Sequence, residues 1–165
     1  MGDALSTWFE ANACYKSSSR NEADGRCTLS ALALAKLCYD TILEYGLSAR
    51  ESCRLNKVTP ALEKVIEANT LMSGLGFESA GLFLSNQPVS LIDEVYTFCA
   101  SVGLPVTLEQ IGVAGPTVED LQKVASAACA SQESIWHEPV EITPDRVAEC
   151  LKLADDHGKR FRSGR

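Results

Sequence analysis

Histidine is almost absent from this sequence, and basic residues are outnumbered by acidic ones. The chain of 165 residues contains two histidines, His137 and His157, and carries 22 acidic against 15 basic residues, for a net charge of -7. Neither histidine belongs to an HExxH segment or to a Cys/His cluster, so no complete metal motif is present. The acidic balance excludes a nucleic-acid partner, because binding to phosphates needs a basic surface.

Long hydrophobic runs and paired cysteines are also missing. No apolar run approaches the roughly 18 residues that span a bilayer, and the N-terminus lacks the features of a secretory signal, so we expect no membrane partner. The seven cysteines are odd in number and widely spaced, and no CxxC pair occurs. Free thiols in a reducing cytoplasm are therefore expected, rather than a disulfide scaffold.

Apolar residues recur with a helical period nearly everywhere, and no segment has a clean period of two. This pattern predicts an all-α fold, a multi-helix bundle, in a single domain over residues 1–165. The first helix is expected to begin at Asp3, whose carboxylate would serve as its N-cap. A second helix, over about residues 28–45, is expected to be buried on nearly all sides and to end at Gly46, with a short exposed helix after it.

Later helix starts are indicated by capping residues. They are Thr59-Pro60, Ser90 with Asp93, Thr117 with Asp120, and Thr143-Pro144. The run Asp155-Asp156-His157 in the last helix resembles a set of metal ligands. However, adjacent residues of a helix point in different directions, so we expect a solvated face there.

Motifs for nucleotide binding and for a serine nucleophile are absent. No G-x-G-x-x-G follows a predicted strand, and no G-x-S-x-G occurs. Residue chemistry alone therefore predicts a helical domain without an assigned function.

Five ordered blocks, which are distributed along essentially the whole chain, resemble the glycerol dehydrogenases of the metal-dependent (iron-containing) alcohol dehydrogenase family. They are GDALSTWFEANAC, TLSALALAKLCYDTILEYG, VTPALEKVIEANTLMSGLGFESAGL, ASVGLPVTLEQIGV and ITPDRVAECLKLADDHGKRF. The resemblance implies an enzyme in which an N-terminal α/β half binds NAD. A C-terminal helical half, of the dehydroquinate-synthase-like type, binds a divalent metal, usually zinc, and glycerol is oxidised to dihydroxyacetone between the halves. The chain matches the helical half, so the NAD-binding domain is expected to be missing.

The resemblance also implies site residues. In the family one aspartate and two histidines hold the metal, and the aspartate of the GDA motif matches Asp3. Phe77, in GFESAG, matches a residue expected to line the glycerol pocket, although a core position is the commoner role of such an aromatic side chain. The first histidine is expected within a few residues of the GFESAG motif and the second further on, but here GFESAGLFLS leads directly into NQPVSLIDEV. The block that carries them is therefore expected to be missing between Ser85 and Asn86.

A lone carboxylate binds zinc weakly, and hydride transfer needs both the metal as a Lewis acid and NAD as the acceptor. The chain is thus interpreted as a truncated glycerol dehydrogenase that is inactive alone and binds neither zinc nor NAD tightly. Two alternatives stay open. One is a non-catalytic interaction module that pairs, as a homo- or hetero-oligomer, with an intact dehydrogenase or a separate nucleotide-binding chain. The other is a residual or new site for a metal or a small molecule that combines Asp3 with His137, His157 or a cysteine.

Overall fold

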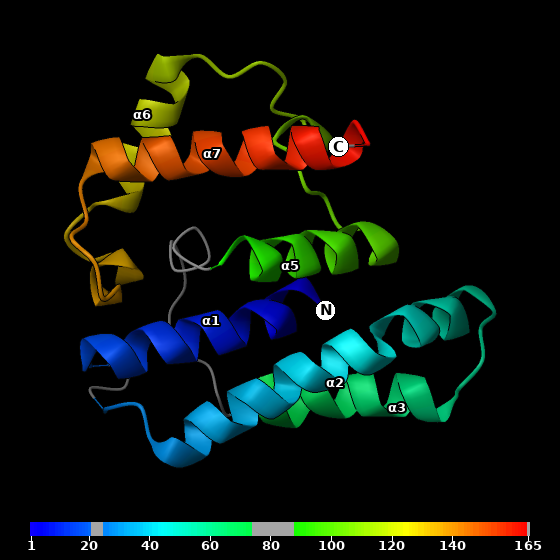
Figure 1. Ribbon diagram of the computed structural model, residues 1–165. Helices are drawn as coiled ribbons and strands as arrows, with labels where there is room; N and C mark the ends of the chain where they lie inside the picture. The colour runs from blue at the N-terminus through cyan, green and yellow to red at the C-terminus, as the bar shows by residue number, and fades with distance from the viewer. Residues whose placement is uncertain (21–24, 74–87, 165) are drawn as a thin grey trace. The chain divides into compact units, whose positions relative to one another are not determined.

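The computed structural model describes residues 1–20, 25–73 and 88–164. These residues form helices, joined by loops that contain one isolated antiparallel bridge between Arg20 and Arg26, and they contain no β-strand. The predicted all-α fold is therefore confirmed (Figure 1). The chain divides into two compact units, Met1–Gly81 and Leu82–Arg165. The single domain stays a prediction, and the seam between Ser85 and Asn86 lies outside the described residues.

The first unit is built around one long helix. It contains α1 (Gly2–Ser17), α2 (Leu29–Arg54), α3 (Pro60–Glu67) and the π-helix η1 (Ala68–Ser73), which continues from α3. Helix α2 packs against both α1 and α3 (Figure 1). Phe9 of α1 meets Tyr39 of α2 edge to face, with ring centroids 5.6 Å apart. The buried apolar side chains of these two helices are Ala4, Leu5, Phe9, Ala11, Ala13, Cys14, Ala35, Cys38, Tyr39, Ile42 and Ala49.

Helix α2 corrects two predictions. It continues unbroken through Gly46, which is buried inside the helix and does not end it. A glycine in a helix interior costs only about 1 kcal/mol, and the burial of Ala49 and Ser52 beyond it offsets that cost. Moreover, α2 is buried along one stripe only, since Leu37 and Leu47 are about half exposed, at 49% and 53%.

Threonine hydroxyls begin four of the helices. Their oxygens accept backbone N–H bonds of 3.1 to 3.4 Å from residues three positions on, in the pairs Thr28–Ala31, Thr59–Leu62, Thr117–Asp120 and Thr143–Arg146. The expected capping pair of Ser90 and Asp93 is wrong. In helix α5 (Val89–Val102) the N-cap position is Pro88, two residues before Ser90, and no side chain caps the helix.

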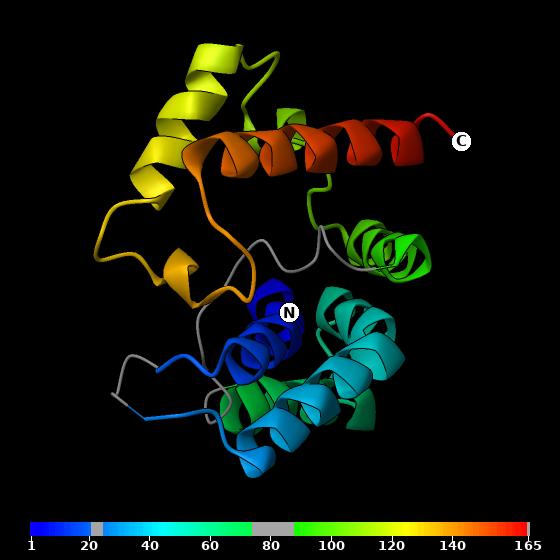
Figure 2. The same cartoon turned by 60° about the vertical axis from the view of Figure 1, so that its left-hand side comes forward.

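The second unit is organised around α7 (Pro144–Arg162). Besides α5 and α7 it contains α6 (Val118–Ala128) and two short 3-10 helices, η3 (Glu109–Ile111) and η4 (Ser134–His137). Helix α6 lies beside the N-terminal part of α7 in both Figures 1 and 2. The C-terminal part of α7 lies close to the backbone of the segment after α5 (residues 103–111). Buried Gly158 is the residue of α7 at this close contact.

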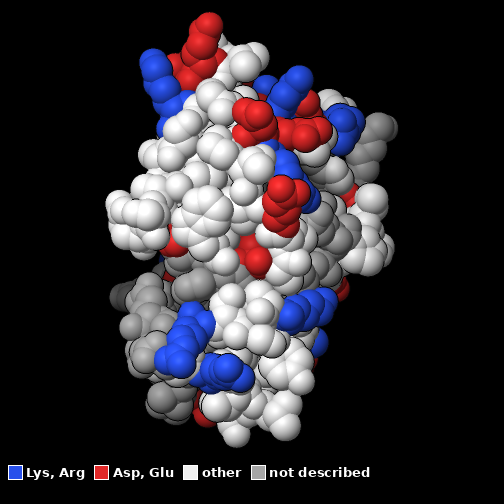
Figure 3. Space-filling model, turned by 90° about the vertical axis from the view of Figure 1, so that its left-hand side faces the viewer, with Lys and Arg blue, Asp and Glu red and all other residues white. Residues whose placement is uncertain are grey.

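In the upper part of Figure 3, where the second unit lies, acidic and basic side chains are intermingled, with uncharged areas between them. That part of the surface therefore offers no continuous basic stripe of the kind that follows a phosphate backbone. None of the helices in the described ranges combines the length and the apolarity needed to cross a bilayer.

Candidate functional site

Asp3, the expected metal ligand, lies in the first turn of α1 and is exposed. The prediction that its side chain caps the helix is wrong, because α1 begins at Gly2, Met1 occupies the cap position, and no side chain caps it. The backbone oxygen of Asp3 accepts hydrogen bonds from Ser6 Oγ (2.8 Å) and Thr7 Oγ1 (3.2 Å). Its carboxylate still lies at the positive end of the helix dipole, which stabilises a negative charge.

Two titratable groups near Asp3 are buried. Glu10 accepts a hydrogen bond from Ser6 Oγ at 2.7 Å. Burial raises the pKa of Glu10, the bond from Ser6 opposes this, and the charge of Asp3 adds to the rise. Cys38 of α2 is fully buried, and burial raises its pKa to about 11.

The thiol of Cys38 is a hydrogen-bond donor in this environment. It donates to the backbone oxygens of Ala4 (3.3 Å) and Ala68 (3.5 Å), and so links α2 to the start of α1 and of η1. Both acceptors belong to the backbone of other helices, so the buried Cys38 thiol holds backbone segments together.

The ligand set does not fit a zinc site in the part of the chain that the structure describes. No three His, Cys, Asp or Glu side chains come together there in a way that could hold a metal ion, whereas a structural or catalytic zinc needs three or four protein ligands. Asp3 belongs to the first unit and His157 to the second. Phe77 and the side chain of His137 lie outside the described residues.

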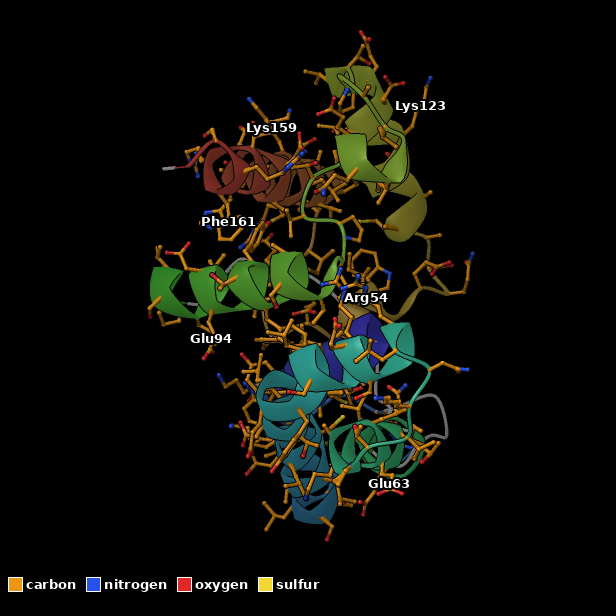
Figure 4. The ribbon with its side chains drawn as sticks, turned by 90° about the vertical axis from the view of Figure 1, so that its right-hand side faces the viewer. Arg54, Glu63, Glu94, Lys123, Lys159 and Phe161 are labelled. Carbon is orange, nitrogen blue, oxygen red and sulfur yellow. The ribbon has the colours of Figure 1, made fainter. Side chains whose placement is uncertain are left out.

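His157 is engaged in joining two helices of the second unit. Its Nε2 lies 3.0 Å from Oδ1 of Asp93 in α5, and its ring packs edge to face on Tyr96 at 4.7 Å. The Tyr96 hydroxyl donates to the backbone oxygen of Ala154 in α7 at 2.8 Å. Phe161, on the side of α7 that faces α5 in Figure 4, lies 6.1 Å from the Tyr96 ring. Asp93 thus joins α5 to α7 instead of capping α5.

Asp155 corrects the prediction of a solvated face, because its side chain is only 6% exposed. Its Oδ1 accepts the backbone N–H of Leu108 at 2.8 Å, and its Oδ2 lies 2.6 Å from the Lys159 ammonium. Burial alone would raise the pKa of Asp155, but the hydrogen bonds from Lys159 and Leu108 outweigh it and hold the pKa below its usual range. The carboxylate anchors the segment after α5 onto α7.

Sequence reasoning missed this second cluster. Asp93 and Asp155 are ordinary helix residues in the sequence, and their partners His157 and Leu108 lie 64 and 47 positions away. The i, i+4 spacing of Asp155 and Lys159 was the only local signal of a paired carboxylate.

Comparison with known proteins identifies close relatives, although no protein-family model matches the chain. The chain is 44% identical to a glycerol dehydrogenase of Thermotoga maritima, in a match that covers 96% of the chain and 53% of the relative. It is 42% identical to a glycerol dehydrogenase of Escherichia coli, with 98% and 53% covered. The crystal structure of glycerol dehydrogenase from Schizosaccharomyces pombe matches 99% of the chain and 51% of that structure, with a TM-score of 0.91 and 30% identity.

The chain spans about half the length of the curated relatives it matches. The match to the Thermotoga maritima protein extends over 192 positions, whereas the chain has 165 residues. At least 27 positions of that match (192 minus 165) therefore have no counterpart in this chain.

Proposed function

Since the chain belongs to the glycerol dehydrogenase family, we propose that it represents the helical half of such an enzyme and that its 165 residues do not oxidise glycerol by themselves. The observation that supports this proposal is the difference in length between the chain and its relative. Within the matched stretch, the Thermotoga maritima protein has at least 27 positions that this chain lacks, enough for the block that is expected to hold the two histidines. We place the loss between Ser85 and Asn86, where the sequence passes directly from GFESAGLFLS to NQPVSLIDEV.

The metal chemistry of the family supports the inactivity. Zinc would supply a Lewis acid that binds the alcohol oxygens and favours the alkoxide. Asp3 is the proposed family ligand in this chain, and it is exposed in the first turn of α1. Of the two histidines, His157 is hydrogen-bonded to Asp93. The remaining ligands of the family would come from the block that is missing at the seam, so we derive no reaction step through a metal in this chain.

The substrate and cofactor assignments follow from the family as well. We propose that Phe77 occupies the position that lines the glycerol pocket, and that NAD is bound by the half of the relatives that the chain does not cover. All seven cysteines lie in the described part of the chain, and none of them forms a disulfide there, which supports a reducing, cytoplasmic location.

The proposal is tested by adding back the block. The purified chain is assayed with glycerol, NAD and zinc, with the Thermotoga maritima enzyme as positive control, and no NADH is expected. A second protein carries the unmatched segment of that enzyme between Ser85 and Asn86. It is expected to bind zinc, and an additional Asp3→Asn change is expected to weaken that binding. NADH formation by the unmodified chain, or no gain of zinc binding after the insertion, would contradict the proposal.

A second candidate function is a helical interaction module, and exposed apolar side chains of the first unit favour it. Leu55 and Val58, at the connection between α2 and α3, are 58% and 78% exposed. Exposed apolar surface is typical of sites that bind other proteins. Retention of an intact glycerol dehydrogenase by the tagged chain would support this function, provided that Val58→Lys weakens the retention. Val118→Lys is the matched control, since Val118 is an equally exposed valine of the second unit, at 80%.

A further inference from the structure

A cavity of about 300 Å³ that is largely open to solvent lies within the second unit, whereas Asp3 belongs to the first unit. Three segments line it: α5, the segment that follows it, and α7. Apolar side chains make up most of the wall, among them Val95, Cys99, Leu108, Ile111, Leu151 and Ala154. All of the lining residues belong to the described part of the chain.

The hydrogen-bonding side chains of the wall already have partners. Both oxygens of Asp155 are engaged, with the Leu108 N–H and with the Lys159 ammonium. The Tyr96 hydroxyl donates to the Ala154 backbone oxygen. The hydroxyl of Thr107 donates to the side-chain oxygen of Gln110 at 3.3 Å. An occupant would therefore replace few of the hydrogen bonds that it makes with water.

A wall of apolar side chains and already bonded polar groups favours apolar ligands over polar or charged ones. On the side that faces the wall, a polar or charged molecule loses water without gaining hydrogen bonds, which is unfavourable, whereas an apolar molecule gains free energy in proportion to the surface it buries. Burial also raises the pKa of the Cys99 thiol, which keeps that part of the wall uncharged at neutral pH. The negative charge of Asp155 is balanced by Lys159 on the same helix.

We propose that this cavity is a binding site for a small, uncharged, apolar molecule of about one aromatic ring. Its volume of about 300 Å³ lies at the lower end of the range of natural ligand pockets, which is roughly 300–1,000 Å³. An engineered apolar cavity of about 150 Å³ is already large enough to bind benzene.

Three probes of nearly equal size test the selectivity: toluene, benzoate and benzylammonium. Each is titrated into the isotopically labelled chain, and amide and methyl shifts are followed by NMR. Toluene is expected to cause saturable shifts centred on Val95, Leu108 and Leu151, and the two charged probes are expected to bind at least tenfold more weakly. The proposal is wrong if toluene causes no saturable shift, or if the charged probes bind equally well.

Matched variants locate the site. Ala154→Phe places a ring in the cavity and is expected to weaken toluene binding at least tenfold. Leu153→Phe, at an adjacent position of α7 that is 52% exposed, is the control and is expected to leave binding unchanged. Equal effects of the two variants would overturn the assignment.

A second readout does not depend on how well Ala154→Phe folds. Cys99 lines the cavity, so saturating toluene is expected to slow its alkylation by iodoacetamide at least threefold, while exposed Cys53 reacts at an unchanged rate. No protection of Cys99 would contradict the proposal. Shifts of the same residues that depend on protein concentration without a probe would assign the cavity to a second copy of the chain and would also overturn it.

Discussion

Gly158 lies so close to Val106 that a Cβ atom on the glycine would stand 1.8 Å from the Val106 carbonyl oxygen. The same Cβ would lie 2.8 Å from the carbonyl carbon of Val106, and Cβ atoms essentially never approach other atoms so closely. Only a residue without a side chain allows α7 to pack on the segment after α5 at this distance.

Gly158→Ala is therefore expected to destabilise the second unit. Alanine favours a helix over glycine by about 1 kcal/mol, but overpacking against a backbone atom costs about 1–3 kcal/mol or more. The net result is a lower urea midpoint. Lys152→Ala, an exposed position of the same helix, serves as control and should change stability by less than about 0.5 kcal/mol. An unchanged midpoint for Gly158→Ala would refute the close approach.

Asp155→Asn is expected to lower stability at neutral pH by about 1–3 kcal/mol, because a buried charged hydrogen-bond acceptor is lost. The pKa of Asp155 is held below its usual range in the folded chain. Its carboxylate therefore contributes stability above about pH 4, the usual value for an unfolded aspartate, and this contribution is lost as the pH falls through the folded pKa.

The measurement is the urea midpoint between pH 2.5 and pH 7. The difference between the original chain and Asp155→Asn should be present at neutral pH and shrink towards the acid end. Asp156→Asn, a half-buried neighbour, is the comparison, and a pH dependence that is the same for both variants would argue against the anchoring role of Asp155.

Thr117→Ala is expected to destabilise α6 by about 0.5–2 kcal/mol, the usual cost of removing an N-cap side chain. Thr117 and Asp120 bond reciprocally, with the Thr117 N–H 3.0 Å from Asp120 Oδ2 and the Asp120 N–H 3.1 Å from Thr117 Oγ1. Ser90→Ala tests the capping pair that the structure does not contain and should be nearly neutral. Thermal unfolding followed by circular dichroism measures both, and equal losses would contradict the assigned helix starts.

The rate of thiol alkylation should differ between the buried and the exposed cysteines. At pH 8, a thiol with a pKa of about 11 is ionised in about one molecule in a thousand, so buried Cys38 should react very slowly in the folded chain. Cys53 is exposed and should be labelled first. Mass spectrometry after a short exposure to iodoacetamide measures the order, and labelling of Cys38 as quickly as Cys53 before unfolding would contradict its buried position.

The sequence predicted the features that depend on near neighbours. The helix starts at Thr117 and Thr143 lie within four residues of the groups they cap, so local patterns reveal them. The family was identified because long blocks of sequence recur in order. In contrast, α2 continues through Gly46 because it packs against α1 and α3. The presence of a glycine in the sequence predicts a helix end and contains no information about that packing.

Local sequence patterns could not predict contacts between residues that are distant in the sequence. The bonds of Asp93 with His157 and of Asp155 with Leu108 arise only when α7 packs onto α5 and onto the segment after it. The apolar cavity has the same origin, because its wall is drawn from three segments whose residues have no common sequence period. For that reason Asp93 was predicted to be a cap and Asp155 a solvated residue.

The zinc content of the purified chain tests the central claim, the loss of the family's metal site, most directly. The protein is prepared with zinc present, dialysed against metal-free buffer and measured by elemental analysis, in parallel with Asp3→Asn and with the Thermotoga maritima enzyme. The account predicts far less than one zinc per chain and no difference between the chain and Asp3→Asn. One zinc per chain that disappears in Asp3→Asn would contradict it, because Asp3 would then be a ligand of a complete site.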